Sequence, residues 1–158
     1  GLAHKSESGA VKVGLQSEQH ILEALYTMPV SISEFLVEQT VVNVVAEILV
    51  SVRRDAPVGW LITLGAGGIY TELWRDTTYL LAPVSDSAIK AALTKLRIAP
   101  LLEGFRGKPA GNTDALVALV QCVIDIAINN DLVEIELNPV LVTPETAIAV
   151  DALLIASI

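Results

Sequence analysis

The chain has 158 residues, 53% of them apolar, and its eighteen acidic and ten basic side chains give a formal net charge of -8 at pH 7. A chain of this length buries about two thirds of its unfolded surface, so it can fold without disulfides or a structural metal. The acidic balance argues against nucleic acid as a partner, and no run reaches the ~18 apolar residues of a membrane span. Residues 1–5 show no secretory signal pattern, so we expect a cytoplasmic protein.

The first half of the chain predicts one helix and a series of extended segments. Alternating apolar residues predict a short strand at 11–15, and Ser17 begins a helix that ends before Pro29. The cluster Gly65-Ala66-Gly67-Gly68 predicts a tight turn. Apolar and β-branched runs predict five further extended segments, at 34–39, 46–53, 60–64, 69–74 and 77–81.

The second half predicts two helices followed by strands. Ser85 begins a helix, residues 100–109 form a loop, and the longest helix runs from about Thr113 to Ile128 behind an Asn112 or Thr113 cap. Cys122 lies on the expected apolar side of that helix, which predicts a buried structural thiol. Three closing strands are predicted, near 132–138, 140–143 and 147–151.

These elements predict an α/β (α+β) fold with a largely antiparallel sheet and packed helices. Most connections after residue 30 are too short for the crossovers that parallel strands require. The glycine cluster is followed neither by Gly-Lys-Ser/Thr nor by a helical pattern. Neither the P-loop nor the dinucleotide-binding fingerprint therefore applies.

A strand that ends in an amide carries the main chemical signal. Glu134, Glu136 and Asn138 share one face of the run 134–139, because successive strand side chains point to opposite faces. If the 147–151 run pairs back antiparallel, Asp151 points toward these oxygens, while Ile148 and Val150 join the apolar layer. Carboxylate and amide oxygens are ligands that Mg²⁺ prefers. A two-faced strand with its polar side in water is the simpler alternative.

Six segments in order resemble the ATP-grasp domain of ADP-forming acyl-CoA synthetases, which are relatives of succinyl-CoA ligase beta subunits. The resemblance covers nearly the whole chain and implies a C-terminal ATP-grasp lobe at 31–158 after a remnant of the N-terminal lobe at 1–30. The matching segments are 4–6 with 9–11, 36–41, 46–59, 65–76, 100–107, and 134–139 continuing to Asp151.

The resemblance implies Mg²⁺ and ATP or ADP as cofactors, and an acid-thiol ligase that moves a phosphoryl group through a phosphohistidine. His4 matches the phosphoryl-accepting histidine of the His-Lys-Ser motif, and Arg106 is the cation best placed by motif. The implied metal ligands are Asn138, Asp151 and Glu136. The implied nucleotide-binding residues are the adenine hinge Glu38, Gln39, Thr40 and Val41, with Glu47, Gly67 and Gly68.

The same resemblance implies partners: the CoA-binding and ligase domains, or a subunit, of the same enzyme. We expect an oligomer, and we expect the isolated chain to be inactive because family members carry a longer N-terminal lobe and a CoA-binding domain. Two alternatives stay open at this point. One is a degenerate assembly or sensing domain of a synthetase-like acyltransferase, and the other is an unrelated structural α/β module.

Overall fold

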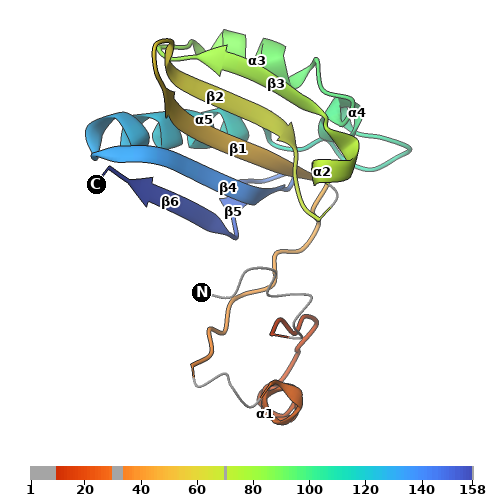
Figure 1. The fold of residues 1–158 in the computed structure, drawn as a ribbon. Coiled ribbons are helices and arrows are strands. Elements are labelled where there is room, and N and C mark those ends of the chain that lie inside the picture. Colours follow the sequence, from red (N-terminus) through yellow and green to blue (C-terminus); the bar gives the residue numbers. More distant parts are fainter. Residues whose placement is uncertain (1–9, 30–33, 70, 158) are drawn as a thin grey trace. The chain divides into compact units, whose positions relative to one another are not determined.

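Two units, Gly1–Val41 and Val42–Ile158, make up the computed structural model, which describes residues 10–29, 34–69 and 71–157 (Figure 1). The first unit contains the predicted helix as α1 (Glu18–Thr27), and the Ser17 hydroxyl accepts a hydrogen bond from the His20 N–H. The strands predicted at 11–15 and 34–39 are wrong, because both segments lack regular structure. β-branched residues favour a strand only where a sheet offers a surface to pack on.

The second unit is built on a six-stranded sheet in which every neighbouring pair is antiparallel. The order is β3-β2-β1-β4, and β5 and β6 both pair with β4 (Figure 1). The antiparallel prediction is thereby confirmed. The strands are β1 (Ala46–Asp55), β2 (Gly59–Ala66), β3 (Thr77–Leu81), β4 (Leu132–Val142), β5 (Ala147–Ala149) and β6 (Ala152–Ala156).

Helices cover one face of this sheet and close the core against it (Figure 1). The helices of this unit are α2 (Thr71–Trp74), α3 (Asp86–Leu93), α4 (Ala99–Glu103) and α5 (Thr113–Asn129). The cap predicted for α5 is confirmed at Asn112, whose side-chain oxygen accepts the Ala115 N–H at 2.9 Å. Among the fully buried core side chains are Ile48, Val50, Val52, Ile62, Leu64, Leu116, Val120, Val140 and Val142. We call the opposite side of the sheet, which carries Ser51, Thr63, Glu134, Glu136 and Asn138, the second face.

Four predictions about the elements of this unit were wrong. Residues 71–74 form α2 rather than a strand, and α4 occupies the beginning of the predicted 100–109 loop. β4 continues through Pro139, where two strands were expected, and the strand predicted at 147–151 is replaced by β5 and a β6 that the sequence did not indicate. No described helix has the length and apolar character to cross a membrane.

β4 continues past the proline because it contains a bulge. Ile48 of β1 pairs with Val140, and Val50 pairs with Leu137, so Asn138 and Pro139 together stand opposite Leu49 alone. Such an extra residue re-aims the side chains that follow it. Leu137 and Val140 therefore both reach the core, although they are an odd number of residues apart.

The bulge also explains a wrong prediction on the neighbouring strand. Ile148 and Val150 were expected in the apolar layer, but they are 38% and 41% exposed. Ala147 and Ala149 lie opposite the core residues Val142 and Val140 instead. Residues directly opposite in an antiparallel pair share a face, so the small alanines take the helix-covered side.

Candidate functional site

Asn138, in the bulge of β4, is held by two contacts from distant parts of the chain. Its backbone N–H donates to the Asp151 carbonyl at 3.3 Å, and its side-chain Oδ1 accepts the Gly68 N–H at 2.9 Å. Asp151 lies between β5 and β6. Val140 pairs with Ala149 and Leu137 pairs with Ala152, so the same register places Asp151 directly across from Asn138. The predicted pairing of the two segments is confirmed, and Cβ atoms of such opposed residues lie about 5 Å apart.

The glycine turn after β2 brings Glu47 of β1 to the same place. The Gly67 N–H donates to the Glu47 carbonyl at 2.8 Å. Gly68 has φ +80, and a Cβ there would overlap the Glu47 carboxylate. We call the five residues Glu47, Gly67, Gly68, Asn138 and Asp151 the bulge cluster. The structure thus unites five residues that the sequence singled out separately.

Close backbone approach explains why this turn is rich in glycine. A Cβ on Gly65 would lie 2.7 Å from the Asp76 carbonyl oxygen, and one on Gly67 would lie 2.6 Å from the Ile48 carbonyl carbon. The backbone N–H groups of Ala66, Gly67 and Gly68 all have protein acceptors. The contact of Gly67 and Gly68 with a nucleotide phosphate stays a prediction. Their backbone N–H groups already donate to protein acceptors, so donation from these groups to a phosphate is not favoured.

Acidic groups on the second face set the electrostatics beside the cluster. Burial, and next the charge of Glu134, raise the pKa of the Glu136 carboxyl above its ordinary value. Glu134 and Glu136 alternate along β4 with core residue Ile135, so both carboxylates lie on the second face. A cation near them would relieve their mutual repulsion.

The donor set of the cluster fits a hard cation that keeps most of its water. Asn138 offers an amide oxygen and Asp151 a carboxylate, and Mg²⁺ commonly takes one or two such protein oxygens beside water and phosphate. One carboxylate oxygen of Asp151 accepts the Ala152 N–H at 3.0 Å. Within the described ranges, no three His, Cys, Asp or Glu side chains form a preorganised metal cluster. Asn138 and Asp151 supply two oxygens, which suits a metal that arrives bound to a nucleotide.

Three further predictions concern Arg106, the hinge at 38–41 and His4. Arg106 has φ 50 on an exposed loop between α4 and α5, and its guanidinium lies 5.3 Å from the Phe105 ring centroid. The predicted hinge Glu38–Val41 belongs to the first unit, where residues 38–40 are exposed. His4 lies outside the described residues.

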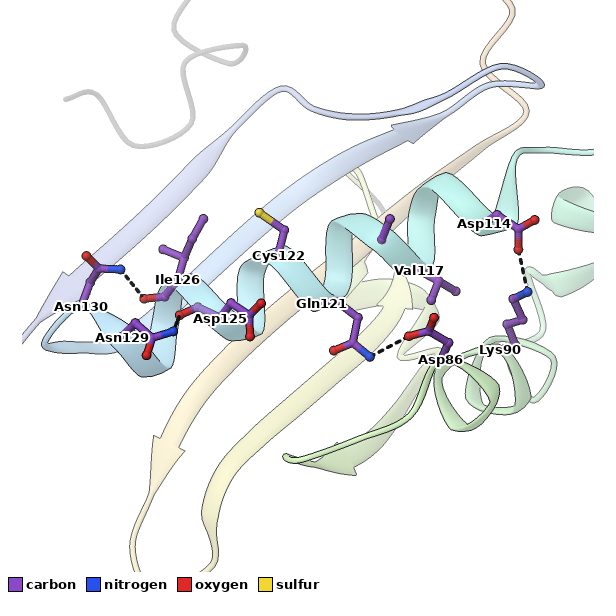
Figure 2. Close-up of a pocket in the computed structure, with 11 residues that line it drawn as sticks. Asp86, Lys90, Asp114, Val117, Gln121, Cys122, Asp125, Ile126, Asn129 and Asn130 are labelled. Carbon is purple, nitrogen blue, oxygen red and sulfur yellow. Dashed lines mark hydrogen bonds and ion pairs between the residues drawn. The ribbon is translucent and has the colours of Figure 1, made fainter.

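A separate hollow of about 800 Å³ lies along α5 beside α3 (Figure 2), and no predicted site residue lines it. Lys90 of α3 pairs with Asp114 of α5 at 2.6 Å, and the Gln121 amide donates to Asp86 at 2.8 Å. Cys122 is exposed at this hollow, so the prediction of a buried thiol is wrong. The apolar stripe of α5 leaves this residue on the outer side of the helix.

The sequence did not indicate that Asp76 supports the turn. Its two carboxylate oxygens accept the N–H groups of Arg97 and Ile98, each at 2.9 Å, and its carbonyl accepts the Ala66 N–H at 2.9 Å. The side chain is only 8% exposed. A buried aspartate with two backbone donors is a structural anchor. The position of Asp76 at the end of the 65–76 motif was the sequence feature that could have indicated this role.

Known proteins resemble this chain over nearly its whole length. A family model described as an ATP-grasp domain matches residues 1–155. The chain is 27% identical to the beta subunit of acetate–CoA ligase [ADP-forming] I from Pyrococcus furiosus, covering 98% of this chain and 70% of that subunit. It is 28% identical to 4-hydroxybutyrate–CoA ligase [ADP-forming] from Nitrosopumilus maritimus, covering 89% of this chain and 22% of that ligase.

Solved structures give the same family. A dinucleotide-forming acetyl-coenzyme A synthetase 1 from Candidatus Korarchaeum cryptofilum, in complex with coenzyme A and Mg-AMPPCP, has TM-score 0.82 and 30% identity, covering 98% of this chain and 71% of that chain. A complex of the same synthetase with coenzyme A and Ca-AMPCP has TM-score 0.79 and 27% identity, covering 99% and 72%. The resemblance inferred from the motifs is confirmed, and the chain belongs to the ATP-grasp domain family.

Proposed function

We propose that this chain is the part of an ADP-forming acyl-CoA synthetase that binds ATP or ADP together with Mg²⁺. The whole enzyme would convert acyl-CoA, ADP and phosphate into the free acid, CoA and ATP, through a phosphohistidine. The chain spans 70% of the Pyrococcus subunit but only 22% of the Nitrosopumilus ligase. The complete reaction is therefore proposed for the enzyme and not for this domain by itself.

The observation that carries the proposal is the pairing of Asn138 with Asp151. Their segments lie side by side in antiparallel register, and the bulge places the amide of Asn138 outside the core. Both residues would hold the metal, and Glu136 is proposed as a third oxygen ligand. When bound, Mg²⁺ neutralises phosphate charge, which is the main requirement of phosphoryl transfer.

The other site residues keep their proposed roles on the strength of the motifs. We propose that main-chain groups at 38–41 read the adenine edge and that Glu47 lies at the nucleotide. Gly67 and Gly68 are proposed to lie beside its phosphates. His4 would accept the phosphoryl group, because a neutral imidazole is a nucleophile near pH 7. Arg106 would supply positive charge to the transferred group.

The proposal extends to partners and to location. Residues 1–30 would end the N-terminal lobe, residues 31–158 would form the C-terminal lobe, and the CoA-binding and ligase parts of the same enzyme would complete the site. We further propose an oligomeric enzyme in the cytoplasm, where nucleotides and coenzyme A are available. Measurement of the molecular mass of the assembled enzyme in solution tests whether it is an oligomer.

Calorimetric titration of Mg-ADP into the protein tests the nucleotide site. We expect measurable binding, weakened at least about tenfold by Asn138→Ala or by Asp151→Ala, since each removes an oxygen ligand. The matched controls are Asn129→Ala and Asp125→Ala, which change the same residue types on the far end of α5. Both controls should bind Mg-ADP like the wild type.

Two results would contradict the proposal. Equal weakening by the matched controls would show that the losses reflect general destabilisation. A folded wild-type protein that releases no heat with Mg-ADP would favour the alternative of a degenerate assembly or sensing domain. Circular dichroism of each variant establishes that it is folded.

A further inference from the structure

We propose that Gly68 is a positioning residue that orients the side chain of Asn138, an inference that rests on the proposed metal-nucleotide function. The Gly68 N–H donates to Asn138 Oδ1 at 2.9 Å, between residues 70 positions apart in the chain. A peptide N–H can only donate, so the amide atom that faces it must be the oxygen. The hydrogen bond therefore selects one of the two possible amide orientations.

The selected orientation leaves the oxygen able to bind a cation. An amide oxygen has two acceptor positions, and Gly68 occupies one of them. The other remains for the metal, beside the cross-strand carboxylate of Asp151. Groups that hydrogen-bond to a metal ligand commonly fix its orientation, and their loss weakens metal binding about tenfold or more. Gly68 would orient the Asn138 amide through its backbone N–H, since it has no side chain that could do so.

A side chain at this position would strain the backbone and displace the Glu47 carboxylate. The φ of +80 lies in the left-handed region that residues with a side chain rarely adopt, and a Cβ would overlap the Glu47 carboxylate. The neighbouring Gly67 N–H is bonded to the Glu47 carbonyl at 2.8 Å. The turn after β2 thus joins the start of β1 to the bulge of β4.

Binding of Mn²⁺ in the presence of ADP, followed by paramagnetic broadening of backbone amide signals, tests the inference. Gly68→Ala is compared with Gly59→Ala, because Gly59 also has a positive φ, of +100, but its Cβ would meet nothing within 4 Å. Gly68→Ala should weaken Mn²⁺ binding about tenfold. Gly59→Ala should leave it unchanged. Equal affinity of the two variants would overturn the inference.

Hydrogen exchange of the Gly68 amide in the metal-free protein supplies an independent readout. Asn138→Ala should accelerate this exchange about tenfold by removing the acceptor, whereas Asn138→Asp retains an oxygen and should preserve the protection. Asn129→Ala is the matched control and should change nothing at Gly68. A Gly68 amide that stays protected in Asn138→Ala would overturn the inference.

The two readouts also separate this inference from the proposed function. Failure of wild-type protein to bind Mn²⁺ in the presence of ADP, with a Gly68 amide whose protection depends on Asn138, would overturn the metal-nucleotide function and the positioning role that rests on it. Wild-type Mn²⁺ binding that is insensitive to Gly68→Ala would overturn the positioning role alone.

Discussion

The two faces of the central sheet share the same strands and differ in what their side chains do. β4 contributes Ile135, Leu137 and Val140 to the helix-covered core, and it contributes Glu136 and Asn138 to the second face. The apolar side is closed by packing against α3 and α5. The second face holds carboxylates, an amide oxygen and a glycine turn, beside the exposed apolar side chains of Leu81, Leu153 and Ile155.

This contrast shows how one strand serves stability and chemistry together. Strict alternation would keep the two sets of side chains apart, but the bulge at Asn138 and Pro139 interrupts it. The interruption lets core packing resume at Val140 while Asn138 is turned toward Gly68. Substitutions on the two faces should accordingly affect different measurements.

The largest effect is expected from the core. Ile62→Ala should lower the free energy of unfolding by about 2–5 kcal/mol, because it removes a fully buried side chain and leaves a cavity. The matched variant is Leu61→Ala, the adjacent residue of β2 on the second face, which is only partly buried. Urea denaturation should show a much smaller loss for Leu61→Ala. Equal losses would break the distinction between the two faces.

Asp76 links the glycine turn to the helix layer, so its substitution should cause the second largest loss of stability. Asp76→Ala leaves the Arg97 and Ile98 N–H groups without their acceptor and should cost about 3 kcal/mol in unfolding free energy. Asp76→Asn keeps one acceptor oxygen and should fall between this variant and the wild type. Thermal unfolding unchanged in Asp76→Ala would contradict the anchoring role.

A smaller loss is expected at the turn itself. Gly67→Ala places a Cβ 2.6 Å from the Ile48 carbonyl carbon, which is backbone and cannot move aside as a side-chain end could. The expected cost is about 1–3 kcal/mol. The comparison variant Gly59→Ala has open space around its Cβ, so only its positive φ is penalised. A Gly67→Ala protein as stable as the wild type would show that the turn adapts.

The smallest effect should come from the charge on Glu136, and it should depend on pH. The raised pKa means that, as pH rises above about 4.5, the unfolded chain releases its proton before the folded protein does. Stability therefore falls through this window and stays lower above the folded pKa. Below pH 4.5, the Glu136 carboxyl is protonated in both the folded and the unfolded state, so it does not change the stability.

Glu136→Gln removes this penalty in the metal-free protein. Its stability relative to the wild type should rise between pH 4 and pH 7, by less than about 1 kcal/mol. Denaturation at several pH values measures the difference. The exposed Glu103→Gln on α4 is the control and should show no such trend. If the stability difference between Glu136→Gln and the wild type did not change with pH, burial would not disfavour the ionised form of Glu136.

Local patterns predicted the elements that depend on nearby residues. The apolar stripe and Asn112 cap of α5, the Ser85 cap of α3 and the alternation of β4 all follow from residues within a few positions of each other. The adjacency of Asn138 and Asp151 was expected only if the two runs paired back as antiparallel neighbours. Short-range periodicity and capping are properties that a sequence carries by itself.

Other features could not be predicted, because distant chain segments decide them. Residues 69–74 have the composition of a strand, yet Thr71–Trp74 form α2 after a turn held by β1 and β4. Pro139 suggested a break, whereas pairing with both β1 and β5 carries β4 through it. β6 exists because β4 offers it an edge.

By itself, the sequence determined an acidic α/β chain with an antiparallel sheet and with two oxygen-bearing residues on adjoining strand segments. Only the tertiary structure decided that the amide of Asn138 bonds to the Gly68 N–H and that Glu47 lies beside it. The physical reason is that a hydrogen bond between residues 70 positions apart depends on strand order, register and a bulge. None of these is encoded in the local pattern around either residue.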